Sequence, residues 1–225
     1  ARDVLLRCRH ARPLGSRHSF NRIADTPYDL IATDGLDRIV ALDRERGRVS
    51  VEGGVRYAAL GAFLDDAGFA LPNLASLPHI SVAGAVATGT HGSGDRNGSL
   101  ATHVRSLELL TPSGDVLVFD ADRDPEFFGA VVSLGALGLV GRLTLDLVPR
   151  FSVAQTVWQN LPWERFLSRF DDLFASAYSV SAFTDWRPDT LPQLWCKARV
   201  GDPEGLSPGA LGALAAPADR HPIDG

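Results

Sequence analysis

The chain of 225 residues contains no methionine, only two cysteines and a single lysine. A P-loop needs the pattern GxxxxGK[ST], and Lys197 lies far from any glycine-rich run, so the sequence excludes that class of nucleotide site. Cys8 and Cys196 are far apart and form no CxxC pair. We therefore expect two free thiols in a reducing compartment.

Other absences narrow the class of protein further. No apolar run reaches the roughly 18–20 residues that a membrane span needs, and no signal-peptide pattern is visible. The formal net charge is −5 and the arginines are scattered, which argues against a nucleic-acid surface. The acidic residues and histidines match no metal-ligand spacing. We expect a cytoplasmic globular protein with no metal, nucleic-acid or membrane partner.

Short apolar strands alternate with turns along most of the chain, and helical patterns are few. This mixture, without a regular βαβ series, predicts an α+β fold. Strands are expected at 12–15, 30–32, 39–43, 48–52, 104–110, 116–119, 140–147, 151–158, 179–187 and 193–200. Helices are expected at 1–9, 57–67, 125–132 and 163–177, and a loop at 201–225. The pattern changes at Pro149, which predicts a boundary between domains at 1–149 and 150–225.

The spacing of apolar residues in the two longer helices predicts which side chains face the core. In the helix at 57–67 these are Leu60, Phe63, Leu64 and Ala67, and Gly68 should end that helix. In the helix at 163–177 they are Phe166, Phe170, Leu173 and Phe174.

The most informative stretch is Pro72–Gly94, PNLASLPHISVAGAVATGTHGSG, which is rich in small residues and hydroxyls and nearly free of charge. Such a run lets the backbone approach a ligand closely and offers the N–H and O–H donors that an anionic pyrophosphate needs. A second stretch, GSRHSFN at 15–21, places His18 among glycine and serine. No GxGxxG follows a strand and opens a helix, so a nicotinamide-type fingerprint is not predicted.

These two stretches, together with GGVRY at 53–57, GSL at 98–100 and SLGALG at 133–138, resemble the FAD-binding (PCMH-type) domain of the vanillyl-alcohol-oxidase superfamily. Within it they are most similar to the alditol (xylitol) oxidases and their sugar-lactone oxidase relatives. The resemblance covers most of the chain. It implies a two-subdomain FAD-binding domain at 1–149 and the start of an α+β substrate domain at 150–225. Because the resembled oxidases are longer at both ends, we expect the chain to be a fragment.

The resemblance also implies the site residues. His18 would bond covalently to the 8α-methyl group of the flavin, and Ser76 would contact the substrate. The implied FAD-binding residues are Leu14, Gly15, Ser16, Arg17, His18, Ser19, Ser76, Ser81, Gly84, Thr88, Gly89, Thr90, His91 and Val140. The small Ala75 would leave room for dioxygen, whereas His79 is expected to be only structural. From composition alone, each of these residues could equally be an ordinary turn or core residue.

The function that the resemblance implies is FAD-dependent oxidation of the terminal hydroxyl of a polyol, such as xylitol or sorbitol, to an aldehyde. Dioxygen would be reduced to hydrogen peroxide, and the complete protein would be a monomer. Most acid, base and substrate-orienting groups would come from a C-terminal half with no counterpart here, so the fragment alone should be inactive. Two alternatives stay open: a sugar-1,4-lactone oxidase or dehydrogenase, and a truncated, non-catalytic flavin-binding module.

Overall fold

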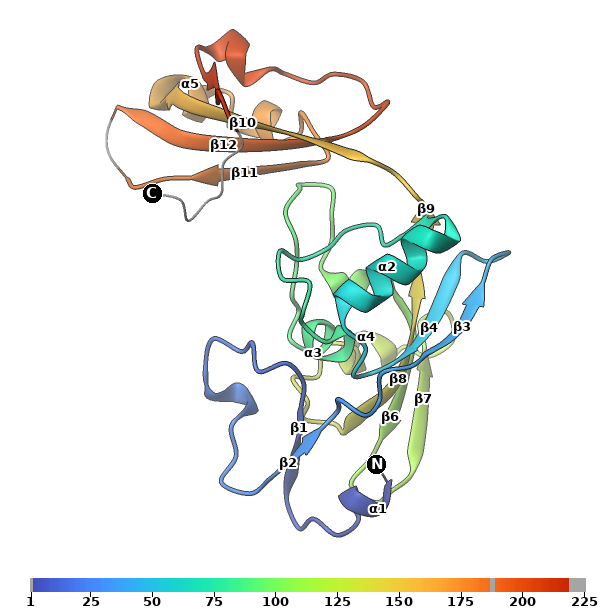
Figure 1. Cartoon of the computed structure of the whole chain (residues 1–225). Helices are drawn as coiled ribbons and strands as arrows, with labels where there is room; N and C mark the ends of the chain where they lie inside the picture. The colour runs from blue at the N-terminus through green and yellow to red at the C-terminus, as the bar shows by residue number, and fades with distance from the viewer. Residues whose placement is uncertain (1, 187–188, 219–225) are drawn as a thin grey trace. The chain divides into compact units, whose positions relative to one another are not determined.

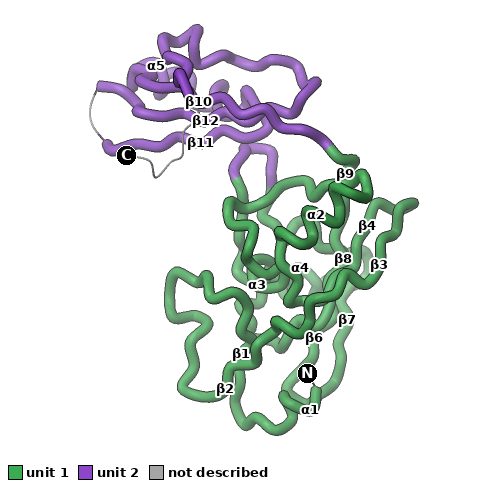
Figure 2. The backbone as a smooth tube through the Cα atoms, in the orientation of Figure 1, with its two compact units in different colours: residues 1–92, 98–150 green, residues 93–97, 151–225 purple. Residues whose placement is uncertain are grey.

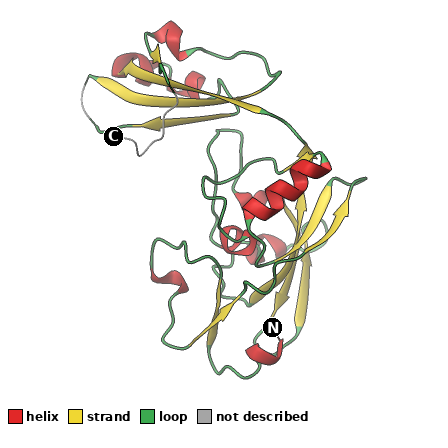
Figure 3. Cartoon of the chain, in the orientation of Figure 1, coloured by secondary structure: helices red, strands yellow, loops and turns green. Residues whose placement is uncertain are grey.

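The structure is a computed structural model that describes residues 2–186 and 189–218. Its mixture of strands and short helices confirms the predicted α+β class (Figure 1, Figure 3). The chain folds as two compact units (Figure 2). One is made of residues 1–92 and 98–150, and the other of residues 93–97 and 151–225.

A five-stranded antiparallel sheet forms the centre of the first unit (Figure 1). Its strand order is β3 (Ile39–Asp43), β4 (Arg48–Glu52), β8 (Leu139–Asp146), β6 (Val104–Leu110) and β7 (Val116–Asp120). Alternation of apolar residues gives the sheet one buried face. Val49 and Val51 of β4 lie opposite Leu145 and Leu143 of β8, and all four side chains are buried.

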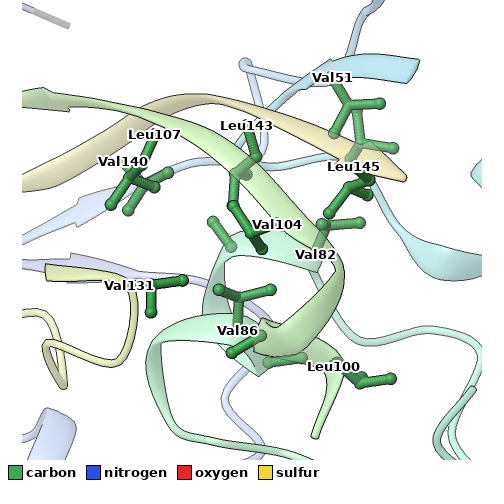
Figure 4. Close-up of a cluster of buried hydrophobic side chains, with 14 of the residues drawn as sticks. Val51, Val82, Val86, Leu100, Val104, Leu107, Val131, Val140, Leu143 and Leu145 are labelled. Atoms are coloured by element: carbon green, nitrogen blue, oxygen red, sulfur yellow. The ribbon is translucent and has the colours of Figure 1, made fainter. Parts of the chain in front are cut away.

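Two helices pack on this sheet and complete the main core. The helix α2 (Tyr57–Ala67) contributes Leu64, and the short helix α3 (Val82–Ala87) contributes Val86. Both side chains belong to the same buried cluster as Leu143 of the sheet. Figure 4 shows Val86 and Leu143 in this cluster. The predicted bounds of α2 are confirmed, because apolar spacing and the following Gly68 are both local signals.

A separate pair of parallel strands carries the 15–21 loop. These are β1 (Ala11–Leu14) and β2 (Asp29–Ala32), and Ile31 of β2 packs with Leu110 and Leu139 in a small buried cluster of its own. The remaining elements of the first unit are α1 (Arg2–Leu5), β5 (Phe69–Ala70), α4 (Phe127–Ala130), β9 (Val148–Pro149) and 3-10 helices at Arg22–Ala24 and Leu100–His103.

The second unit is a four-stranded antiparallel sheet covered by short helices. Its strand order is β11 (Ser179–Phe183), β12 (Thr190–Arg199), β10 (Val153–Pro162) and β13 (Leu214–Ala215). Its helices are α5 (Trp163–Ser168), α6 (Phe170–Phe174) and a 3-10 helix at Pro208–Leu211. Leu161, Leu173 and Leu194 form its buried core. Residues 93–97 join this unit through Asn97, whose Nδ2 donates to the carbonyl of Tyr178 at 3.3 Å.

Several predicted element bounds are wrong. The helix expected at 1–9 is limited to Arg2–Leu5, with residue 1 outside the described part, and the helix expected at 125–132 is limited to Phe127–Ala130. The helix expected at 163–177 is broken at Arg169, whose φ of −126° and ψ of 27° are not helical. The strand expected at 179–187 ends at Phe183, and residue 187 lies outside the described residues. The expected loop at 201–225 contains β13 and a 3-10 helix, and its residues 219–225 are not described.

Two aromatic side chains predicted to face the core are exposed instead. Phe63 on α2 is 38% exposed, because the buried stripe of that helix is formed by Tyr57, Leu60 and Leu64. Phe170 is 45% exposed, although its ring still contacts the ring of Phe166 edge-on at 5.5 Å between centroids.

The described residues offer neither a membrane-spanning helix nor a metal site. Each of their helices is too short or too polar to span a bilayer. Within the same residues, no group of three or more histidine, cysteine, aspartate or glutamate side chains could hold a metal ion.

Candidate functional site

A cavity of about 940 Å³, counting the space that is open to solvent at its mouth, lies in the first unit. Three parts of the chain form its wall: β1 with the loop that follows it, the segment around α3, and the turn that leads into β8. Its lining residues are Arg12, Pro13, Leu14, Gly15, Ser16, Arg17, His18, Ser19, Ile23, Ala24, Thr33, Ile80, Ala83, Gly84, Ala85, Ala87, Thr88, Thr90, Leu134, Gly135, Gly138 and Val140.

Most of the residues predicted from sequence to bind a cofactor meet in this cavity. Those that line it are Leu14, Gly15, Ser16, Arg17, His18, Ser19, Gly84, Thr88, Thr90 and Val140. Ser76 and His91 are exposed and Gly89 is half-buried, and none of the three is among the lining residues. Ser81 lies directly behind the lining. The binding roles predicted for all fourteen residues stay predictions.

Close backbone approach at two glycines brings the first two parts of the wall together. A Cβ atom added to Gly15 would lie 2.5 Å from Oγ of Ser81, and one added to Gly84 would lie 2.7 Å from the same atom. The backbone N–H of Ser81 donates to Oγ of Ser16 at 3.3 Å. Small residues at these positions therefore allow the loop after β1 to lie against the start of α3.

The hydroxyl of Ser81 fits a ligand rather than the protein around it. Ser81 is only 1% exposed, and its Oγ finds no hydrogen-bond partner among the described residues. Buried polar atoms are normally satisfied, so this orphaned hydroxyl directly behind the cavity lining would gain from a polar group supplied from outside the chain.

The charge of the lining suits an anion. Arg12, Arg17 and His18 line the cavity, and no aspartate or glutamate is among the described residues that do so. The hydroxyls of Thr88 and Thr90 lie 3.3 Å apart at the same wall. Cationic side chains together with hydroxyl donors form the charge-assisted hydrogen bonds that phosphate oxygens accept.

His18 is hydrogen-bonded to a residue that sequence reasoning treated as merely structural. Its Nε2 lies 2.5 Å from Nε2 of His79, and the two ring centroids are 4.5 Å apart. Both side chains are exposed, although only His18 is a lining residue. The two residues are 61 positions apart in the chain, so no local pattern could have indicated their contact.

The turn that leads into β8, the third part of the wall, belongs to the motifs that resemble the family, but no binding role was predicted for its residues except Val140. Leu134, Gly135 and Gly138 line the cavity, and the N–H of Leu134 donates to the carbonyl of Ala87, at the end of α3, at 2.9 Å. The glycine-rich run SLGALG at 133–138 is the sequence feature that could have indicated these lining residues. Arg12, Thr33 and Ile80 were missed entirely.

A turn behind the cavity fixes the position of Thr33. A Cβ atom on Gly54 would overlap the carbonyl oxygen of Thr33, so glycine is required there. The N–H of Thr33 donates to the carbonyl of Leu14 at 3.0 Å, and both residues line the cavity. Next to this turn, hydrogen bonds from Arg38 lower the pKa of the buried Glu52 below its usual value.

The sequence profile of a family described as an FAD binding domain matches residues 7–120. The chain belongs to this family of FAD-binding domains. The match spans the wall around His18 and the segment around α3, where the cavity is found.

Among curated proteins, alditol oxidase from a Streptomyces species is 48% identical over 210 residues, which cover 92% of this chain and 49% of that protein. L-gulono-1,4-lactone dehydrogenase of Mycobacterium tuberculosis is 41% identical over 142 residues, which cover 63% of this chain and 33% of that protein. L-gulonolactone oxidase of Bos taurus is 35% identical over 164 residues, which cover 71% of this chain and 37% of that protein. The chain thus spans about half the length, or less, of these relatives.

Among solved structures, cholesterol oxidase from Brevibacterium sterolicum superposes with a TM-score of 0.73. The match covers 86% of this chain and 41% of that one at 17% sequence identity. Likeness at this identity shows a shared fold and carries no information about the substrate.

Proposed function

We propose that the protein containing this chain oxidises the terminal hydroxyl of polyols, such as xylitol or sorbitol, to an aldehyde with FAD, and passes the electrons to dioxygen to form hydrogen peroxide. The observation that carries the proposal is the 48% identity to alditol oxidase across 92% of the chain. The cavity supports it, because cationic, hydroxyl and glycine residues of its lining lie within the part of the chain that matches the FAD-binding family.

In this proposal the lining residues divide the work of holding FAD. Arg12 and Arg17 neutralise negative charge and donate hydrogen bonds to phosphate oxygens. Val140 and the other apolar lining side chains exclude water from the rings. When bound, FAD supplies the acceptor for the hydride that leaves the carbinol carbon, and the protein supplies orientation and electrostatics.

We also propose that FAD is attached covalently through His18. A neutral imidazole beside the 8α-methyl group is a nucleophile, and His18 lies at the cavity wall in the GSxHS context. Attachment prevents loss of the cofactor. It also removes the need for a high reversible affinity.

Acid precipitation of the complete natural protein tests the attachment. Yellow flavin should remain in the wild-type pellet, and the pellet of His18→Ala should be colourless. The control His10→Ala changes an exposed histidine that does not line the cavity and whose ring contacts that of Tyr28, and it should leave the pellet yellow. Flavin found only in the wild-type supernatant would rule out the linkage.

Substrate profiling separates the polyol proposal from its rival. The relatives from Mycobacterium tuberculosis and Bos taurus favour a sugar-lactone oxidase or dehydrogenase as the second candidate. Hydrogen peroxide release with xylitol or sorbitol, and none with L-gulono-1,4-lactone, is expected. Turnover of the lactone alone would favour the rival, and turnover only with an artificial electron acceptor would indicate a dehydrogenase. The 225-residue chain by itself should release no peroxide, and failure of the complete protein with every donor would favour a non-catalytic flavin-binding module.

A further inference from the structure

A hairpin at residues 90–100 begins and ends in the first unit, whereas its tip folds with the second unit. At its base the N–H of Leu100 donates to the carbonyl of Thr90 at 2.9 Å, and His91 pairs with Ser99 in an antiparallel bridge. Thr90 lines the cavity. The tip, residues 93–97, belongs to the second unit (Figure 2). One continuous run of backbone therefore leads from the cavity wall into the fold of the second unit.

Polar contacts and close packing hold the base of this hairpin in the first unit. Nδ2 of the buried Asn73 donates to the carbonyl of Gly98 at 2.9 Å, and Nε2 of His103 lies 2.9 Å from Oδ1 of Asn73. A Cβ atom added to Gly92 would overlap the carbonyl oxygen of Leu74, so the chain passes this point without room for a side chain. The base of the hairpin is thus fixed by the same unit that forms the cavity.

Two side chains tie the tip of the hairpin to the residues that lead into β11. Nδ2 of Asn97 donates to the carbonyl of Ser93 at 2.9 Å, which closes the tip, and to the carbonyl of Tyr178 at 3.3 Å. Oγ of Ser93 is hydrogen-bonded to Oγ of Ser179, whose side chain is buried. Loss of either tie would leave a buried polar group without its partner, so docking of the tip depends on both.

The rest of the tip is seated equally closely. Gly94 has a φ of 111°, and a Cβ atom added to it would lie 2.5 Å from the carbonyl oxygen of Tyr178. Nη2 of Arg96 donates to the carbonyl of Ala175 at 3.0 Å. The tip is therefore an ordered part of the second unit.

We propose that Asn97 and Ser179 are positioning residues through which FAD binding in the first unit and the folded state of the second unit stabilise each other. The inference rests on the proposed binding of FAD in the cavity. FAD that restrains Thr90 also restrains the base of the hairpin, so the tip has less conformational freedom left to lose when it docks. By thermodynamic linkage, a docked tip strengthens FAD binding by the same factor.

The affinity for FAD tests this coupling from the side of the second unit. The complete natural protein carries His18→Ala as the parent, so that binding is reversible, and equilibrium dialysis gives the dissociation constant. Asn97→Ala removes two hydrogen bonds of the tip and should weaken FAD binding by about 5-fold or more, the lower end of typical couplings between sites. Ser179→Ala removes one hydroxyl of the second unit and should weaken binding in the same direction. The matched control Ser181→Ala, two residues further along β11, should bind FAD as the parent does.

Hydrogen exchange followed by mass spectrometry separates coupling from a merely structural role. In the parent, FAD should slow amide exchange in peptides covering residues 179–183 and 190–199 by about 5-fold or more. In Asn97→Ala the second unit should keep its exchange protection without FAD, but FAD should no longer add to it. If Asn97→Ala does not fold, Ser179→Ala decides by the same two measurements.

Two results would overturn the inference. One is an equal dissociation constant in the parent, Asn97→Ala and Ser179→Ala. The other is an undiminished effect of FAD on the exchange of residues 179–183 in these variants. Absence of FAD binding from the parent itself would instead overturn the proposed cofactor, so the two failures are told apart by dialysis of the parent alone.

Discussion

Replacement of Gly54 by alanine and of Gly61 by alanine should change stability in opposite directions. A Cβ atom on Gly54 would overlap the carbonyl oxygen of Thr33 and would lie 2.8 Å from the carbonyl oxygen of Leu36. Both are main-chain atoms, so no side-chain rotation relieves the clash. A Cβ atom on Gly61 would meet nothing within 4 Å, because that side of α2 faces open space.

The size of the effect follows from the groups that must move. Overpacking costs about 1–3 kcal/mol. The hydrogen bonds from the N–H of Gly54 to Leu36 and from the N–H of Leu36 to Thr33, both 2.8 Å, are strained as well, and each contributes about 0.5–1.5 kcal/mol. The smaller unfolded-state entropy of alanine offsets about 0.4–1 kcal/mol. We expect Gly54→Ala to lower the free energy of unfolding by about 2–4 kcal/mol, and Gly61→Ala, in a helix interior, to raise it by about 0.5–1 kcal/mol.

Urea unfolding followed by far-UV circular dichroism is the suitable assay. Tryptophan fluorescence would report the wrong unit, since all tryptophans lie in the second unit, at Trp158, Trp163, Trp186 and Trp195. Gly54→Ala should also lower FAD content, because Thr33 is bonded to Leu14 at the cavity wall. A change of the same sign in both variants would refute the reasoning, as would a loss in Gly54→Ala below about 0.5 kcal/mol, the size of an ordinary surface substitution.

Two other substitutions test the small-residue run at 72–94 and the ion pair between Arg38 and Glu52. Gly89 has a φ of 66°, which a β-branched side chain disfavours, so Gly89→Val should lose FAD while Asp122→Asn, at an exposed carboxylate, keeps it. Equal flavin absorbance in the purified Gly89→Val and Asp122→Asn variants would contradict this expectation. Because Arg38 lowers the pKa of Glu52 from its ordinary 4.5, the carboxylate stabilises the fold above that pH, and the contribution is lost as pH falls through the lower folded-state pKa. Glu52→Gln should therefore flatten the decline of the unfolding free energy below about pH 4.5, as measured by denaturant titrations across that range.

Local patterns predicted the elements well where local forces decide them. The bounds of α2 follow from Leu60 and Leu64 on one stripe and Gly68 after the last turn. The break at Arg169 has no such signal, because the surrounding residues still show helical spacing. The membership of residues 93–97 in the second unit depends on contacts such as Ser93 with Ser179, which are 86 positions apart and are formed only in the folded chain.

The same distinction holds for the candidate site. The family motif indicated residues 14–19, which all line the cavity, because its glycine and hydroxyl residues are contiguous in sequence. Thr33 was missed because it reaches the cavity through the parallel pairing of β1 with β2, where Leu14 aligns with Ala32. Ile80 and Leu134 reach it through the packing around α3. These contacts depend on pairing and packing between distant parts of the chain, which local sequence patterns do not predict.

Ser81 shows how function departs from what folding alone would select. Its hydroxyl is buried without a partner among the described residues, and such a group costs about 1–3 kcal/mol. Alanine would fill almost the same volume without that cost. When no ligand is bound, serine is therefore the less stable choice at this position. A ligand oxygen that satisfied the hydroxyl would remove the cost, which is why we propose a role for Ser81 in cofactor binding, alongside the packing of the neighbouring residues of α3 in the core.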